Sequence, residues 1–405
     1  MWELKPEKKI GINSSRCETL DTTLEMLTDI VPKVPITRIS DLTPLDKLGL
    51  PAYSAVTPLA RDLTTHLGKG VTKEGAKVSA MMEAVERVSA ESTSDDRVQN
   101  ASYNELKNSE LLTAVNPEIF SLPPDSKFEP DRKYSWLTCH DLVSDTSIMV
   151  AADLVLSPPN EEMLLNVDTN GLASGNSLLE AVNHALCEVI ERDAISQYEF
   201  LAKYGDDELP SVYRNISLST LPEPVRSLCE KIEKFGLHIN VKDITTDISI
   251  STFRAVIVDP DFPSDQGPRT LISPGFGTHP NSTVAVQRAV TEAVQARVSY
   301  IQGARDAFNV LPINKVFSRK HMLGDLTPIP TSPFSSVVSL EFENLLDELR
   351  KILDRLIDVK LDQVIVCNLT HCDLNVPVVR VKVPGLSGFV LNRNLVDERC
   401  YRHIL

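Results

Sequence analysis

Three segments of this chain repeat one pattern, and this repeat constrains the fold more than any other feature of the sequence. Each segment passes from a glycine-bearing stretch into a helix that carries a glutamate followed three residues later by Glu or Gln. Superposing the segments aligns Glu83, Glu188 and Glu292, then Glu86, Glu191 and Gln295, preceded by Ser79, His184 and Arg288. Repeated units in which strands and helices alternate predict an α/β or mixed α+β fold.

The middle copy carries the clearest helix signals. A turn rich in Gly and Asn ends before Ser177, which is placed as an N-cap with Glu180 three residues later. At 100° per residue, Glu180, His184, Glu188 and Glu191 fall within an arc of roughly 80°. Three carboxylates on one helix face require a counter-charge.

Any one of these helices could be an ordinary surface helix, because charge rows at this spacing are common on solvated faces. Their recurrence instead favours a cleft in which facing glutamates would repel one another unless divalent cations lay between them. Glycine-rich turns before helix N-termini suit phosphate, as do the basic residues Lys69, Arg87, Arg192 and Arg288. Small residues on the same helices would permit close approach of a neighbouring element: Ala84, Ala181, Ala185, Ala289 and Ala293. The combination predicts Mg-ATP binding.

The motifs resemble those of the YcaO family, ATP-dependent enzymes that activate a peptide backbone amide. They are G-K-G at 68–70, S-x-x-x-E-x-x-E-R at 79–87, N-G-L-A-S-G-N-x-x-x-E-A at 170–181, E-x-x-E-R at 188–192 and R-x-x-x-E-x-x-Q at 288–295. The resemblance covers essentially the whole chain. It implies one YcaO domain over residues 1–405, with approximate parts 1–95, 96–270 and 271–405, and ATP held between acidic helices through several Mg²⁺ ions.

The resemblance also implies individual roles. The metal ligands would be Glu83, Glu86, Glu188, Glu191 and Glu292. The nucleotide would contact Arg16, Thr23, Lys69, Ser79, Glu83, Arg87, Glu180, Asn183, His184, Arg192, Arg288 and Gln295. Stabilisation of charge in the transferring phosphoryl group would fall to Arg87, Arg192 and Arg288. For Arg16 and Thr23, seven residues apart and nearly on one face if helical, a solvated arginine and a helix cap are an equal alternative.

The ends of the chain bear on the reaction. Azoline-forming members often finish in Pro-x-Pro-x-Pro, whereas this chain ends in Cys-Tyr-Arg-His-Ile-Leu, and its first motif already appears by residue 68. It therefore resembles stand-alone members that, often with a TfuA-like partner, use a sulfide source to install thioamides, including thioglycine in the α subunit of methyl-coenzyme M reductase. An azoline-forming cyclodehydratase and an ATP-responsive accessory protein remain the alternatives.

Composition limits the partners and the compartment. A net charge of −15 and a pI near 5.1 argue against a nucleic-acid surface. The N-terminus lacks a signal-peptide core and no run of apolar residues is long enough for a membrane span, so we expect a cytoplasmic protein, as a homodimer that acts on a protein or peptide. The seven cysteines are scattered and odd in number, which disfavours a disulfide framework.

Outside the repeat, local patterns predict helices near 19–30, 221–236 and 342–357 and strands at 51–56, 134–139, 147–152, 238–244, 251–259, 363–367 and 378–383. Residues 95–133 look like a Pro-rich surface excursion. The run 139–141, Cys-His-Asp, is not a triad, because neighbours on a strand point to opposite faces. The group formed by Cys367, His371 and Cys372 lacks the paired ligands of structural zinc sites. Asn368 stands where related sequences tend to have Asp.

Overall fold

The computed structural model describes residues 4–91, 98–108, 113–120, 122–123, 125–159, 161, 164, 168–205, 212–260, 272–304 and 331–403. Three sheets organise these residues. The first is antiparallel, in the order β1 (Arg38–Asp41), β2 (Ala52–Val56) and β3 (Thr65–Lys69). The second runs β12 (Ile272–Thr278), β11 (Thr252–Val258), β10 (His238–Asp243), β9 (Arg214–Ile216) and β13 (Thr331–Ser332).

The third sheet is the largest. It runs β5 (Thr113–Ala114), β7 (Thr146–Ala151), β6 (Lys133–Asp141), β14 (Ile365–Asn368), β15 (Val378–Lys382) and β8 (Leu172–Ser174), with β4 (Val98–Ser102) also paired to β6. Its strands come from residues 98–174 and 365–382, so the middle and last parts of the chain share one sheet. The mixed α/β class expected from the repeat is confirmed.

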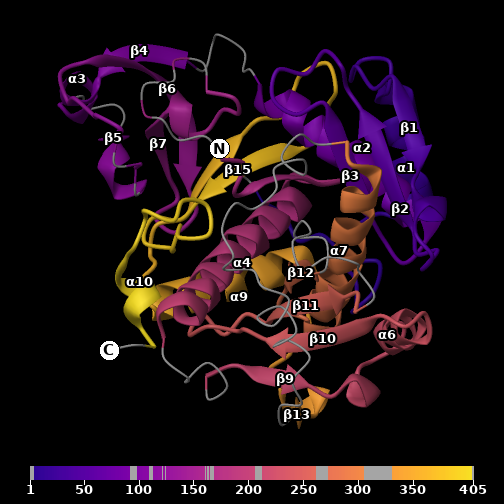
Figure 1. Ribbon diagram of the computed structural model, residues 1–405. Helices are drawn as coiled ribbons and strands as arrows, with labels where there is room; N and C mark the ends of the chain where they lie inside the picture. The colour runs from indigo at the N-terminus through magenta and orange to yellow at the C-terminus, as the bar shows by residue number, and fades with distance from the viewer. Residues whose placement is uncertain are drawn as a thin grey trace.

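Eight α-helices lie in the described part of the chain: α1 (Leu20–Ile30), α2 (Lys73–Ala90), α3 (Tyr103–Lys107), α4 (Leu178–Tyr204), α6 (Val225–Lys234), α7 (Ser282–Gln302), α9 (Leu345–Asp358) and α10 (Glu398–Tyr401). The three repeat helices are α2, α4 and α7. Figure 1 shows α4 crossing the centre of the molecule, with α2 and α7 beside it. The expected N-cap is present, because the Ser177 side chain accepts a hydrogen bond from the Glu180 amide.

Each repeat helix buries its apolar face in a core of its own. Met81 and Val85 of α2 pack in a core with β6 and β7, Val286 and Val290 of α7 pack on β11, and Leu186 of α4 packs against β15 and α9. This is the amphipathic arrangement that the repeat pattern predicts. It leaves the acidic face of every repeat helix turned away from its own core.

Glycines before the first and third repeat helices lie in strands, which corrects our expectation of turns there, whereas Gly171 before α4 lies in a turn as expected. Gly68 is in β3, and Gly275 and Gly277 are in β12. A Cβ on Gly68 would lie 2.0 Å from the Ala76 carbonyl oxygen, and one on Gly275 would lie 2.1 Å from the Ala293 amide nitrogen. These glycines therefore let a strand pack directly on the backbone of the helix that follows. The small residues of the helices serve the same close approach.

The predicted surface excursion at 95–133 is partly wrong. Within it, β4 pairs with β6 along its whole length, from Val98 opposite Leu137 to Ser102 opposite Lys133. The Ser102 side chain then begins α3 with a capping box. The strands predicted at 134–139 and 147–152 are confirmed as β6 and β7, which pair as an antiparallel hairpin, and the helix and strands predicted near the C-terminus are confirmed as well. The strand predicted at 251–259 is followed in the sequence by a Pro-rich stretch at 260–268, for which the sequence predicts a loop, and most of this stretch lies outside the described residues.

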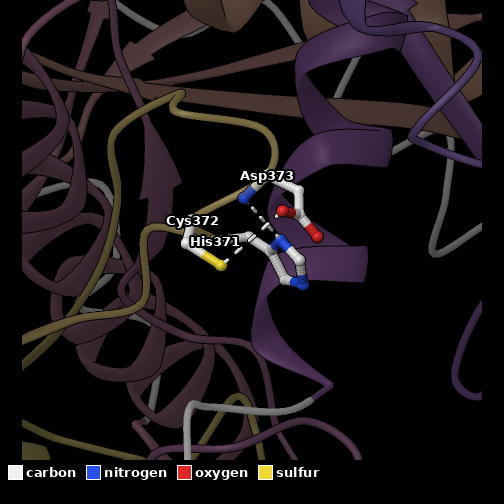
Figure 2. A group of neighbouring side chains, drawn as sticks. All are labelled: His371, Cys372 and Asp373. Atoms are coloured by element: carbon white, nitrogen blue, oxygen red, sulfur yellow. Dashed lines mark hydrogen bonds between the residues drawn. The ribbon is translucent and has the colours of Figure 1, made fainter.

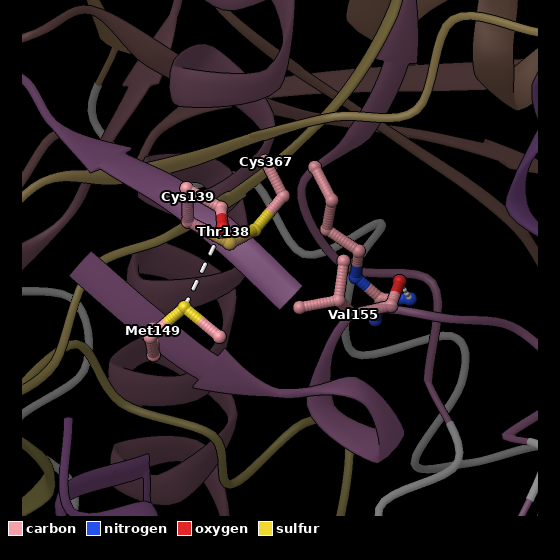
Figure 3. The surroundings of a disulfide bond; sticks show 6 residues. Thr138, Cys139, Met149, Val155 and Cys367 are labelled. Atoms are coloured by element: carbon pink, nitrogen blue, oxygen red, sulfur yellow. Dashed lines mark hydrogen bonds between the residues drawn. A yellow bond between two sulfur atoms is a disulfide. The ribbon is translucent and has the colours of Figure 1, made fainter. Parts of the chain in front are cut away.

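One pair of cysteines departs from the expectation of free thiols. Cys139 and Cys367 face each other across β6 and β14 and form a disulfide, with their Cα atoms 4.5 Å apart (Figure 3). Pairing depends on the register between strands far apart in sequence, which cysteine spacing does not reveal. The other five cysteines are free thiols. Among the described residues, no helix combines the length and the apolar content that a membrane crossing needs.

Candidate nucleotide and magnesium site

The first copy of the repeat connects its glutamates to two strands. Glu83 of α2 accepts a hydrogen bond of 2.8 Å from the backbone amide of Leu67 in β3. Glu86, one turn later, accepts bonds of 2.9 and 2.7 Å from the amide and the hydroxyl of Ser174 in β8. Because β8 leads into α4, Glu86 joins the first repeat helix to the start of the second.

The second copy contributes two more carboxylates and an arginine. Arg192 Nη1 lies 3.2 Å from Glu191, and its Nη2 lies 3.8 Å from Glu188. Burial raises the pKa of Glu86 and of Glu188 to about 7, although Ser174 and Arg192 oppose the shift. The charges of neighbouring glutamates contribute in the same direction. Burial also raises the pKa of Glu191.

The third copy brings a lysine from the first sheet to a glutamate of α7. Lys69, at the end of β3, forms an ion pair with Glu292. Burial alone would raise the pKa of Glu292, but Lys69 and Arg192 outweigh it and lower that pKa. Gln295 donates a 2.6 Å hydrogen bond to the carbonyl oxygen of Leu67. The backbone of Leu67 is therefore held by α2 on one side and by α7 on the other.

A direct contact joins the second and third helices. Arg288 Nη2 of α7 donates to His184 Nε2 of α4 at 2.8 Å. Burial and the Arg288 charge lower the pKa of His184 well below its usual value, so its imidazole is neutral and can accept this bond. Aligned positions of two repeats thus meet across the space between the helices.

The N-terminal segment contacts the start of α4 through residues whose arrangement the sequence spacing did not predict. Arg16 precedes α1 and does not share a helix face with Thr23. Nevertheless Arg16 Nη1 lies 3.0 Å from Glu180, Thr23 donates to Asn176 at 2.8 Å, and Asn176 donates to Glu180. The Glu180 carboxylate also accepts from the Cys17 amide at 3.0 Å. Glu180 therefore holds the N-terminal segment against α4.

Two of the expected nucleotide contacts, Asn183 and Arg87, bond to other groups. Asn183 donates to the Leu345 carbonyl oxygen at 2.9 Å, on the side of α4 that faces α9. Arg87 pairs with Asp62 at 2.8 Å. Ser79 is partly buried on α2, one turn before Glu83. The charge of Arg87 nevertheless opposes the rise in the pKa of Glu188.

A buried charge cluster beside the site was missed in the sequence. Asp168 lies 2.6 Å from Arg380 and 3.2 Å from Lys382. Burial alone would raise the pKa of Asp168, but the two bases outweigh it and lower that pKa to about 2. Burial and Arg380 lower the pKa of Lys382 to about 8. The alternation in Val-Arg-Val-Lys put both bases on one face of β15, but nothing in the sequence placed Asp168 there.

The group of Cys367, His371 and Cys372 that was considered from the sequence does not come together in the structure. Cys367 belongs to the disulfide, while His371, Cys372 and Asp373 form a group on the loop after β14 (Figure 2). Their potential ligand atoms lie within 4.8 Å of one another. The His371 Nδ1 atom, however, already accepts a 3.2 Å hydrogen bond from the Asp373 amide. Successive residues of a largely exposed turn explain the grouping, and we assign no metal to it.

The residues of the main cluster fit Mg²⁺. Glutamates from three helices converge, and burial raises the pKa values of Glu86, Glu188 and Glu191, with the charges of neighbouring glutamates adding to each shift. Carboxylate oxygens are the ligands that Mg²⁺ prefers, and it commonly bridges them to phosphates. Glu83, Glu86, Glu188, Glu191 and Glu292 would hold the ions, and Lys69, Arg192 and Arg288 would meet phosphate oxygens.

Comparisons with known proteins agree with this geometry. The family model described as YcaO cyclodehydratase, ATP- and Mg²⁺-binding, matches residues 67–387. An uncharacterized protein of Methanothermobacter thermautotrophicus is 33% identical over 93% of this chain and 96% of its own length. An uncharacterized protein from the tfuA 3′ region of Rhizobium leguminosarum bv. trifolii is 32% identical over 87% of this chain and 84% of its own.

Solved structures share the fold. A YcaO protein from Methanopyrus kandleri, bound with AMPPCP and Mg²⁺, superposes with a TM-score of 0.76 over 98% of both chains at 22% identity. A heterocyclase in complex with substrate and cofactor gives a TM-score of 0.79 over 96% of this chain and 54% of the other, also at 22% identity. The chain belongs to the YcaO family, and its cofactors are ATP and Mg²⁺.

Proposed function

We propose that this protein uses ATP and Mg²⁺ to convert a peptide backbone amide into a thioamide. The observation that carries the proposal is the convergence of glutamates from α2, α4 and α7, with Lys69, Arg192 and Arg288 beside them. Such a site suits a nucleotide whose phosphates are bound through cations. The matching family model is described as ATP- and Mg²⁺-binding. The relative from the tfuA 3′ region supports thioamidation as the outcome.

The chemistry follows from the inertness of an amide. Resonance strengthens its C–N bond, and its oxygen is a poor leaving group. Transfer of the γ-phosphoryl group from ATP to that oxygen, with release of ADP, makes the carbon electrophilic and turns the oxygen into part of a phosphate. Hydrosulfide then attacks the carbon, phosphate departs with the original oxygen, and the S–H proton leaves as the C=S bond forms.

The chain's own residues would stabilise charge during phosphoryl transfer. Arg192 is held by Glu188 and Glu191, and Arg288 is held by His184, so both guanidinium groups are fixed before substrate binds. Preorganised cations of this kind stabilise a transferring phosphoryl group without reorganising. Bound Mg²⁺ would supply further neutralisation of phosphate charge. This route requires no side-chain nucleophile.

The substrate that we propose is the α subunit of methyl-coenzyme M reductase, in which a glycine would become thioglycine. The relative from Methanothermobacter thermautotrophicus, which is matched over 96% of its length, supports this assignment. We further propose a TfuA-like partner, a separate sulfide source, and a homodimer as the assembly. Analytical ultracentrifugation tests the dimer directly.

A cyclodehydratase is the second candidate, because the matching family model and a heterocyclase structure both point to azoline formation in relatives. One experiment separates the possibilities. A peptide that spans the target glycine and a neighbouring cysteine is incubated with the protein, ATP, Mg²⁺ and sulfide, and the product is weighed by mass spectrometry. Exchange of oxygen for sulfur supports the proposal, and loss of water supports the azoline. Phosphate release that does not depend on peptide, with no change in peptide mass, supports an accessory protein.

A further inference from the structure

A cavity of about 410 Å³ lies beside the carboxylate site. Its wall consists mainly of β15 and residues 383–395, completed by residues 168–170, by Val189 of α4 and by residues near β5. Such a volume takes a few residues of an extended chain rather than a folded domain. Phe120, Leu391 and Leu395 give it an apolar side, and Leu391 is 42% exposed at the surface.

The cavity also has a charged and polar floor. Lys382 and Asp168 both line it, and their ion pair is backed by Arg380, whose side chain is 2% exposed. The floor therefore carries two positive charges and one negative charge. Asn170, another lining residue, has a side-chain oxygen without a hydrogen-bond partner among the residues that the structure describes. Hydrogen-bond donors and an acceptor thus line the same cavity as apolar side chains.

The cavity and the carboxylate site are bounded by the same elements, α4 and the segment from Asn170 to Ser174. Val189 lines the cavity and directly follows Glu188 on α4. The strand after Asn170 ends at Ser174, which donates two hydrogen bonds to Glu86. The Glu188 carboxylate acts electrostatically on both bases of β15. A molecule in the cavity would therefore lie next to the place where ATP and its cations are bound.

We propose that this cavity binds the peptide segment whose backbone amide is modified, and this inference rests on the proposed function. A peptide backbone presents alternating N–H and C=O groups, which match Asn170 and Lys382 on the floor, while flanking side chains contact Leu391 and Leu395. A glycine at the reacting position lets the backbone approach the wall formed by α4 without a side chain in between.

Peptide binding tests the inference without any turnover. The probe is a fluorescein-labelled peptide from the methyl-coenzyme M reductase α subunit, centred on its glycine, titrated with protein that is saturated with Mg-AMPPCP. Lys382→Met removes a charged donor, and Leu391→Trp fills the cavity from its open side. Each is expected to weaken binding by about tenfold or more. Ile301→Trp, a change at a residue that is 45% exposed on α7, is the matched control and keeps wild-type affinity.

The affinity of every variant for Mg-AMPPCP, measured by calorimetry, shows whether the nucleotide site is intact. Unchanged peptide affinity in Leu391→Trp, or a wild-type protein that does not bind the peptide, overturns the inference. Peptide that binds in the cavity but is not thioamidated with ATP and sulfide contradicts the proposed function and leaves the binding site standing. The two failures are therefore distinguishable.

Discussion

Replacing Glu191 by Gln separates the stability of the empty protein from its ability to bind Mg-ATP. The Glu191 side chain is 6% exposed, and burial raises its pKa, so the surrounding protein disfavours its charge. Glutamine keeps the shape and an oxygen that can accept from Arg192, which also retains Glu188 at 3.8 Å. We therefore expect the melting temperature of the nucleotide-free variant to equal or exceed that of wild type.

The same change removes an anionic ligand from the proposed cation site. A ligand present at 100 times its Kd stabilises the native state by about 2.7 kcal/mol. With an unfolding entropy of about 2.1 cal/mol/K per residue, a chain of 405 residues then gains about 3 °C in Tm. Loss of an outer-shell partner of a metal typically costs 10–100-fold in affinity, and loss of a ligand costs at least as much. At about 100-fold weaker binding the gain falls to about 0.4 kcal/mol, under about 1 °C.

Differential scanning calorimetry with and without Mg-ATP measures both quantities. Glu199→Gln is the matched control, because it makes the same change on the same helix at the exposed ion pair with Arg393. It should retain the full Mg-ATP shift. A Glu191→Gln protein that keeps the wild-type shift would refute the assignment of Glu191 as a cation ligand. A much lower Tm without nucleotide would show that its role is structural instead.

Three further predictions follow from other parts of the structure. Gly275→Ala places a Cβ 2.1 Å from helix backbone and should destabilise the protein by at least about 1–3 kcal/mol in urea unfolding, whereas Gly11→Ala, which meets nothing within 4 Å, should not. Asp168→Asn should lower the free energy of unfolding by about 2 kcal/mol at pH 7, because its basic neighbours hold the pKa of Asp168 at about 2. This difference in the free energy of unfolding between wild type and Asp168→Asn should persist down to about pH 4 and narrow towards pH 2. Urea unfolding of both proteins at each pH measures it. With free sulfide supplied, Cys187→Ala should keep most thioamide formation and Arg87→Ala should lower it about a hundredfold in single-turnover assays; loss of activity in the cysteine variant would instead indicate a persulfide carrier.

Local signals in the sequence predicted the repeat helices well. Ser177 caps α4 as its spacing from Glu180 indicated, and the apolar face of α2 is buried at Met81 and Val85. The glycines before α2 and α7 were misplaced because Gly is as typical of a turn as of a close approach between backbones. Only the distance from Gly68 to Ala76 distinguishes the two. The presence of glycine in the sequence carries no information about that distance.

Contacts over long sequence separations were beyond prediction. Asp168 meets Arg380 across 212 residues, and the Cys139 disulfide depends on the pairing of β6 with β14. Asn183 was expected at the nucleotide. It precedes His184 by one residue, which places it about 100° away around α4, and there it donates to Leu345 beside α9. Helix periodicity assigns a face to such a residue only when the neighbours of both faces are known.

The central claim is that ATP activates the amide oxygen itself, and the fate of that oxygen tests it most directly. The reacting glycine carbonyl is labelled with ¹⁸O, and the labelled peptide is incubated with the protein, Mg-ATP and sulfide in unlabelled water. Our account predicts one ¹⁸O atom in the phosphate released for each thioamide formed. If the ¹⁸O atom instead stays in the modified peptide or is released as water, phosphorylation of the amide oxygen is contradicted.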